Sequence, residues 1–245
     1  MNMLNSYFAD SYSGGHLSIN EDCVIADVSN ELFGIVDAYG GSGIGDITAE
    51  LIKKTILESY GILSADENAT LPLYFNPNYS IETNALINSL KLAHSTIKDR
   101  NKGKDTSSRG AASFIGCILG EKRLQLVGTG NCLALSVRKG EVSLSYTPDS
   151  NLALPLTGKG NANNYPFSGL GLFDSLEFYV REVPILKGDY LILLSSGTYA
   201  PFNLTELAIL LKEHVGDFQL LKTELHQLSV ARGAKGNQSI VCLEF

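Results

Sequence analysis

The chain has 245 residues and a formal net charge of −7, with 19 Lys and Arg against 26 Asp and Glu. A chain of this length can bury a substantial core, as one large domain or two small ones. An acidic balance disfavours binding to nucleic acid or to anionic membrane surfaces, because both reward basic patches. We therefore expect neither as a partner.

The cysteines stand in apolar, strand-like runs and form no CxxC pair: Cys23, Cys117, Cys132 and Cys242. This pattern favours reduced, buried thiols over disulfides or a zinc site, and a cytoplasmic location. The first residues lack the basic and apolar regions of a signal peptide. No apolar run approaches the roughly 20 residues that a membrane helix needs.

The first third of the chain predicts three strands and then a helix. Strands are expected at 7–12, 22–28 and 32–37, and the last two form a hairpin around Ser29 and Asn30. A glycine cluster at 40–45 precedes a helix that is expected to begin near Asp46, whose carboxylate suits the free N–H groups of a helix start. An irregular segment, 61–79, should follow this helix.

The middle of the chain predicts a helix at 81–100 and then a meander of strands. The helix carries an apolar stripe at helical spacing: Leu86, Leu90, Ala93 and Ile97. Strands are expected at 113–119, 123–128, 132–138 and 142–146, joined by short turns. Sequential strands of this kind favour antiparallel over parallel pairing.

The last third begins with a long loop, 147–173, rich in Asn, Gly, Pro and Ser, which we expect to be mobile. Strands at 176–184 and 190–194, helices at 204–213 and 217–230 and a strand at 239–245 complete the pattern. We see no linker or repeat, and we predict a single α+β domain over 1–245. The four histidines are scattered and are expected at the surface: His16, His94, His214 and His226.

Several short motifs follow one another along the chain. Asn20-Glu21-Asp22 comes first, and a run that ends in Asp37-Ala38-Tyr39-Gly40-Gly41 follows it. Five later segments continue the series: 110–113, 126–131, 147–150, 187–197 and 236–241. In this order the motifs resemble those of the PPM (type 2C) family of metal-dependent serine/threonine protein phosphatases, whose E-D strand and D-G-H-G-G turn are similar to the first two. The resemblance covers essentially the whole chain. It implies a four-layer α-β-β-α sandwich with two mostly antiparallel sheets.

The resemblance also implies a site for Mg²⁺ or Mn²⁺, since the family activates water with two or three such ions held by carboxylates. The positions retained for metal are Glu21, Asp22, Asp37 and the carbonyl group of Ala38. An alternative stays open for the acids: Asp37 can cap the glycine turn, and Glu21 and Asp22 can be solvated or hydrogen-bonded at a strand end. Residual metal binding, if any, is expected to be weak.

Other positions of the site depart from the family pattern. Ser196, Gly236 and Thr129 stand where the family has aspartates, and Leu17 lies about where an arginine holds the substrate phosphate. Tyr39 replaces the histidine of D-G-H-G-G. A serine hydroxyl is a weak neutral ligand and glycine has no side chain. We therefore assign no catalytic residue from the sequence.

These departures predict a pseudophosphatase that acts as a protein-binding or regulatory module, with a protein partner that the sequence does not identify. The alternative is an active Mg²⁺- or Mn²⁺-dependent serine/threonine phosphatase, in which an acid from elsewhere replaces a lost ligand. Candidates for such an acid are Asp10, Asp149 and Asp174. A third hypothesis, a pocket for a small molecule, has no residue to support it.

Overall fold

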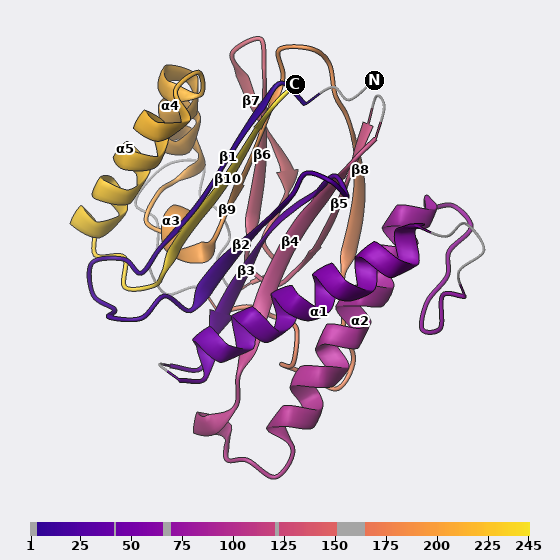
Figure 1. The fold of residues 1–245 in the computed structure, drawn as a ribbon. Helices are drawn as coiled ribbons and strands as arrows, with labels where there is room; N and C mark the ends of the chain where they lie inside the picture. The colour runs from indigo at the N-terminus through magenta and orange to yellow at the C-terminus, as the bar shows by residue number, and fades with distance from the viewer. Residues whose placement is uncertain (1–3, 42, 66–69, 121–122, 151–164) are drawn as a thin grey trace.

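The structure is a computed structural model that describes residues 4–41, 43–65, 70–120, 123–150 and 165–245. Two five-stranded antiparallel sheets face each other, and helices cover both outer faces (Figure 1). The predicted α+β sandwich of helix, sheet, sheet and helix layers is confirmed.

The first sheet has the order β1 (Ser6–Tyr12), β10 (Gln238–Glu244), β9 (Tyr190–Leu194), β6 (Leu133–Arg138) and β7 (Glu141–Tyr146). The second has the order β2 (Asp22–Asp27), β3 (Leu32–Tyr39), β4 (Ala111–Leu119), β5 (Arg123–Thr129) and β8 (Tyr179–Pro184). The helices are α1 (Gly45–Ala65), α2 (Ile81–Asn101), α3 (Ser196–Tyr199), α4 (Leu204–His214) and α5 (Phe218–Ala231), with a 3₁₀ turn at Thr106–Ser108.

Three apolar layers hold the four structural layers together. Helices α1 and α2 pack on the second sheet through residues such as Ile52, Ile56, Leu86 and Leu90. The sheets pack on each other, and α4 and α5 pack on the first sheet. Each fully buried side chain of this size stabilises the fold by about 1.5–3 kcal/mol relative to exposure.

Alternation along β3 decides which residues face the other sheet. Leu32 and Val36 pack toward the helices, whereas Phe33 and Ile35 pack between the sheets. Because side chains alternate along a strand, Asp37 lies on the same face as Phe33 and Ile35. The same alternation in β2 places Asp22 on the face of Val24, so both acids lie between the sheets at one end of the sandwich.

Local capping marks the helix starts. Ser80 accepts a hydrogen bond from the Thr83 N–H at the start of α2. Asn203 and Glu206 form a capping box at the start of α4, in which each side chain accepts from the other's backbone N–H. Helix α1 begins at Gly45, close to the expected start near Asp46, but the Asp46 carboxylate accepts from the Gly43 N–H at 2.7 Å, which precedes the helix.

The structure differs from the sequence prediction at four further points. The strands from 111 to 146 do not form one meander, because the chain passes from the second sheet to the first between β5 and β6, at Gly130 with φ +81°. Helix α1 runs to Ala65, into the segment expected to be irregular. The strand expected at 176–184 begins only at Tyr179, and α3 was not predicted.

The expected mobile loop, 147–173, lies largely outside the described residues. Near its C-terminal end the loop pairs with β4. The Leu170 N–H donates to the Ala112 carbonyl at 2.7 Å, and the Ala112 N–H donates to the Leu170 carbonyl at 3.0 Å. All four cysteines are free and buried, as predicted. Among the helices of the described residues, none has the length and apolar character that a membrane span requires.

Candidate functional site

The candidate site lies at the end of the sandwich opposite the C-terminus of the chain (Figure 1). Here β2 begins, β3 ends, β9 leads into α3 and the chain enters β10. A pocket of about 550 Å³ opens at this point. Its lining includes seven of the positions singled out in the sequence: Leu17, Glu21, Asp37, Ala38, Tyr39, Ser196 and Gly236.

Glu21 forms hydrogen bonds with two other segments of the chain. Its N–H donates to Asn237 Oδ1 at 3.0 Å, and its Oε2 accepts from the Gly41 N–H at 3.1 Å. The carboxylate lies against Gly45, where a Cβ atom would come within 2.1 Å of Oε2. Burial raises the pKa of Glu21, although the Gly41 bond opposes the shift. Glu21 therefore stabilises the glycine turn and the start of α1.

Asp22 and Asp37 are direct partners in the β2–β3 register and both are buried. Asp22 Oδ2 accepts from the Ser239 hydroxyl at 2.8 Å, while its Oδ1 is buried without a hydrogen bond among the described residues. Burial first, and then the charge of Asp37, raises the pKa of Asp22 well above its usual range. Burial also raises the pKa of Asp37. Two adjacent buried carboxyls favour a state in which one of them carries a proton.

Asp37 connects the two sheets through α3. Its Oδ2 accepts from the Ser196 N–H at 2.7 Å, and Ser196 is the first residue of α3. The first N–H groups of a helix have no partner within the helix, so a carboxylate there is stabilising. Asp22 makes a second connection, from β2 to β10 through Ser239. The acids that the family resemblance assigns to metal thus act as hydrogen-bond acceptors of the scaffold.

Tyr39 forms part of the pocket wall. Its hydroxyl lies 2.8 Å from where a Cβ atom of Gly169 would be, and it has no hydrogen bond among the described residues. Burial raises the pKa of Tyr39, so the side chain stays neutral. Ala38, beside it, is buried and pairs with Ala112 of β4.

The substituted positions do not all meet at the pocket. Ser196, Gly236 and Leu17 line it, and 38% of Leu17 is exposed. Thr129 does not line it, because this residue is fully buried and its hydroxyl donates to Ser168 Oγ at 3.1 Å. Among the pocket residues that the sequence analysis did not single out are Asn131, which accepts from the Ser113 hydroxyl at 2.6 Å, and Asn237. Their signal was only their place beside substituted positions.

The acids considered as replacement ligands lie elsewhere. Asp174 is exposed and binds Lys98 at 2.7 Å, and Asp10 binds Lys222 at 3.1 Å. Asp149 lines a different hollow, of about 400 Å³. The structure therefore brings none of the three into the pocket lining.

A pair of divalent ions does not fit these residues. Within the described residues, no three His, Cys, Asp or Glu side chains converge in a way that could hold a metal ion. Glu21 and Asp37 each spend one oxygen on a backbone N–H. Mg²⁺ requires near-octahedral oxygen coordination, which one or two carboxylates do not provide by themselves.

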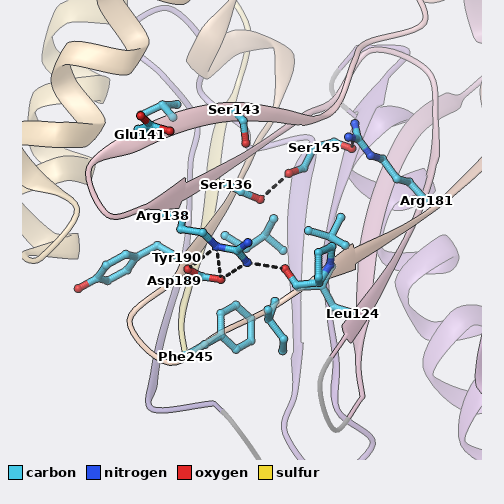
Figure 2. A pocket seen from close by; sticks show the side chains of 15 residues that line it. Leu124, Ser136, Arg138, Glu141, Ser143, Ser145, Arg181, Asp189, Tyr190 and Phe245 are labelled. Atoms are coloured by element: carbon cyan, nitrogen blue, oxygen red, sulfur yellow. Dashed lines mark hydrogen bonds and ion pairs between the residues drawn. The ribbon is translucent and has the colours of Figure 1, made fainter.

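A second hollow, of about 310 Å³, lies at the edge strands β7 and β8 (Figure 2). Arg138 binds Asp189 at 2.9 Å and donates to the Pro184 carbonyl at 2.8 Å. Arg181 donates to the carbonyls of Leu144 and Ser145 at 3.0 and 3.1 Å. Because both guanidinium groups are used to join the two sheets, this hollow is a structural junction.

No protein-family model and no curated protein matches the chain. Solved structures do match it. Mycobacterium tuberculosis serine/threonine phosphatase PstP/Ppp is similar at a TM-score of 0.76 and 18% identity, over 98% of each chain. PppA, described as a key regulatory component of T6SS in Pseudomonas aeruginosa, is similar at 0.74 and 20% over 99% of each. The PPM Ser-Thr phosphatase MsPP from Mycobacterium smegmatis is similar at 0.75 and 14% over 99% of each. Over nearly its full length, the chain has the fold of bacterial PPM-type serine/threonine phosphatases.

Proposed function

We propose that this protein is a pseudophosphatase: a PPM-type fold that binds a protein partner or regulates one without hydrolysing phosphate. The observation that carries the proposal is the bonding of the retained acids. Asp37 accepts from the start of α3, and Glu21 accepts from the glycine turn. The acids have a structural use that explains their presence without catalysis.

The substituted positions support the same conclusion on grounds of charge. Two adjacent divalent ions repel each other and need several carboxylates to hold them. Ser196 and Gly236 line the pocket without contributing a carboxylate, and Leu17 contributes no positive charge for a phosphate. Nothing among the described lining residues clamps a phosphate as an arginine would.

The alternative is an active Mg²⁺- or Mn²⁺-dependent serine/threonine phosphatase. One observation favours it: the adjacent, buried Asp22 and Asp37, with an unpartnered oxygen on Asp22 among the described residues, are the type of group that a cation stabilises. The positions of Asp10 and Asp174, each paired with a lysine, weaken this alternative.

The remaining features of the proposal follow from composition. A chain with a net charge of −7 is suited to a protein partner better than to nucleic acid or a membrane surface. Four free, buried cysteines suit a reducing compartment such as the cytoplasm.

Calorimetric titration with Mn²⁺ tests the proposal. We expect the wild-type protein to show no binding below millimolar Mn²⁺, and the double variant Ser196→Asp/Gly236→Asp to bind at least ten-fold more tightly, because it returns two carboxylates to the pocket. The variant is sterically feasible, since a Cβ atom at Gly236 would lie 3.6 Å from its nearest neighbour, an ordinary contact.

A matched control adds the same charge away from the pocket, as Ser143→Asp/Gly216→Asp. Both positions are exposed, and a Cβ atom at Gly216 meets nothing within 4 Å. This control should behave as wild type does. Wild-type protein that binds two Mn²⁺ ions at micromolar concentration would overturn the proposal.

A further inference from the structure

The chain between α2 and β4 is basic, although the protein as a whole is acidic. Residues 98–109 carry five Lys and Arg against two Asp, in a chain with a net charge of −7. Two of these cations are already paired, since Lys98 binds Asp174 at 2.7 Å and Lys102 binds Asp99 at 2.6 Å. The other three have no carboxylate partner among the described residues: Arg100, Lys104 and Arg109. We call this segment, 100–109, the basic loop.

Hydrogen bonds within the basic loop hold it in one shape. The buried side chain of Asn101 closes its base, because Nδ2 donates to the Gly110 carbonyl at 2.7 Å and Oδ1 accepts from the Gly110 N–H at 3.1 Å. Arg109 Nε donates to the Lys104 carbonyl at 2.9 Å, which leaves the terminal N–H groups of the guanidinium available. A loop that is ordered before binding loses less conformational entropy when it binds.

The basic loop lies beside the candidate site. A Cβ atom at Gly40, in the glycine turn, would come within 3.1 Å of the Arg109 carbonyl oxygen. A Cβ atom at Gly171 would come within 3.2 Å of the Gly110 carbonyl oxygen, and the next residue, Leu172, lines the pocket. Figure 1 shows the loop at the same end of the molecule as the start of α1. A partner that binds the loop would therefore be held next to the pocket.

The position of the basic residues is only partly explained by the helix. Cations in the last turn of a helix are stabilised by its dipole, and the last turn of α2 contains Lys98 and Arg100. Lys104 and Arg109 lie beyond the end of α2, at Asn101, where this effect has ended. Their positive charge therefore has no use within the described part of the protein.

Exposed apolar side chains border the basic loop. Phe173 is 48% exposed and directly precedes Asp174, the partner of Lys98. Ile47 is 42% exposed and directly precedes Thr48, which packs against the end of the loop at Gly110. Apolar and aromatic side chains beside charged ones are typical of a protein-interaction surface.

A short acidic segment of a protein matches this surface better than a long polyanion does. Nucleic acid is bound through many phosphate contacts, whereas the basic loop offers three free cations. Helix α1, beside the loop, exposes Glu50, and the chain outside 98–109 is acidic, so an extended polyanion or an anionic membrane would be repelled. Aspartate and glutamate, by contrast, pair with arginine through two parallel hydrogen bonds.

From this arrangement we infer that the basic loop binds an acidic segment of a partner protein. Arg100, Lys104 and Arg109 pair with Asp and Glu side chains of that segment, and an apolar residue within it contacts Phe173. The inference rests on the proposed function, because it gives the chemistry of the partner that the pseudophosphatase binds. The retained acids of the pocket take no part in this recognition.

Titration with peptides, followed by amide NMR in buffer with a metal chelator, tests the inference. The probe is acetyl-Glu-Asp-Phe-Glu-Asp-Glu-amide, and its matched control is acetyl-Gln-Asn-Phe-Gln-Asn-Gln-amide. We expect the acidic peptide to bind about ten-fold or more tightly than its control, with shifts at the amides of Lys104, Arg109 and Gly110. Its affinity should fall steeply between about 10 mM and 150 mM salt, because the screening length falls from about 30 Å to about 8 Å.

Variants locate the binding. Arg100→Glu/Lys104→Glu reverses two charges whose side chains make no hydrogen bond among the described residues, and it should abolish binding. The control Lys187→Glu/Lys212→Glu makes the same change of charge at exposed positions before β9 and on α4, and should bind as wild type does. Should the first variant not fold, Arg109→Gln should weaken binding while Arg109→Lys, which keeps the charge, should retain it.

Each other outcome overturns the inference. Equal binding of the two peptides would mean that charge is not recognised. Tighter binding of a single-stranded oligonucleotide or of anionic lipid vesicles would assign the loop to nucleic acid or to a membrane. Displacement of the peptide by equimolar inorganic phosphate would show a simple anion site. Because the chelator removes Mn²⁺, the peptide result stands whether or not the protein proves to be a phosphatase.

Discussion

At the scale of single residues, the retained carboxylates are explained by the groups that they contact. Asp37 accepts from Ser196 N at 2.7 Å, and Asp22 accepts from Ser239 Oγ at 2.8 Å. The first contact joins β3 to the start of α3, and the second joins β2 of one sheet to β10 of the other. A buried N–H or hydroxyl that loses such a partner costs about 1–3 kcal/mol, which is enough to maintain these acids without catalysis.

Two substitutions of Asp37 separate a structural from a metal-binding role. Asp37→Asn keeps an oxygen that can accept from the Ser196 N–H, whereas Asp37→Ala removes it. We expect the alanine variant to be less stable than the asparagine variant by about 1–3 kcal/mol, measured by urea unfolding in the presence of chelator. Equal stabilities would show that this hydrogen bond does not explain the retention of Asp37.

The buried side chain of His226 should make the free energy of unfolding depend on pH. It is buried, against the expectation of a surface position, and it stacks on Tyr12 with ring centroids 5.6 Å apart. Burial, helped by Lys222, lowers the pKa of His226 from 6.5 to about 4. The unfolded chain therefore takes up a proton below pH 6.5 that the folded protein does not, and stability falls from pH 6.5 toward pH 4 by up to about 3 kcal/mol.

The variant His226→Phe retains a ring against Tyr12 and cannot titrate. Its free energy of unfolding should fall less than that of wild type between pH 7 and pH 4, as measured by urea unfolding at each pH. His16, which is exposed, offers the control His16→Phe, whose pH dependence should match wild type. A His226→Phe variant with the full wild-type pH dependence would contradict the assignment.

At the scale of elements, the hairpin between α1 and α2 is held by buried asparagines that the sequence did not single out. Asn88 Oδ1 accepts from the N–H groups of Leu73 and Tyr74 at 2.9 and 3.2 Å, and its Nδ2 donates to the Tyr74 carbonyl at 2.7 Å. Asn84 makes equivalent bonds to the backbone of Asn76. The amide side chains thus make the hydrogen bonds to this backbone that a neighbouring strand would otherwise make.

Removal of one of these amides should loosen the segment locally. Asn88→Ala leaves two backbone N–H groups without their acceptor, and we expect a loss of about 1–3 kcal/mol and faster hydrogen exchange at the Leu73 and Tyr74 amides. The exposed Asn78 gives a matched control, Asn78→Ala, with no change in either measurement. Unchanged exchange in Asn88→Ala would show that the segment is held by other contacts.

The accuracy of the sequence prediction differs between elements for physical reasons. The hairpin of β2 and β3 was predicted because alternation and the Ser29–Asn30 turn are local signals. The change of sheet between β5 and β6 was not, because Gly130 marks a turn without specifying which strands then pair. Helix α3 is only four residues long and is held by Asp37, a residue distant in sequence.

At the scale of the whole molecule, the order of the motifs predicted the fold, while the site depended on contacts between distant segments. The family resemblance assigned Glu21, Asp37, Ser196 and Gly236 to one site, and in the structure all four line one pocket. It did not predict that Ser196 and Ser239 would donate to Asp37 and Asp22, or that Asn237 would accept from the Glu21 N–H, because each partner is distant in sequence. Thr129 was assigned to the site and lies outside the lining.

We propose that this protein, with its phosphatase fold, does not hydrolyse phosphate esters. The direct measurement is turnover of p-nitrophenyl phosphate and of a phosphothreonine peptide by the wild-type protein in millimolar Mn²⁺, with Asp37→Ala and chelator as controls. We expect no turnover above that of Asp37→Ala. Robust wild-type turnover that both Asp37→Ala and chelator abolish would contradict it.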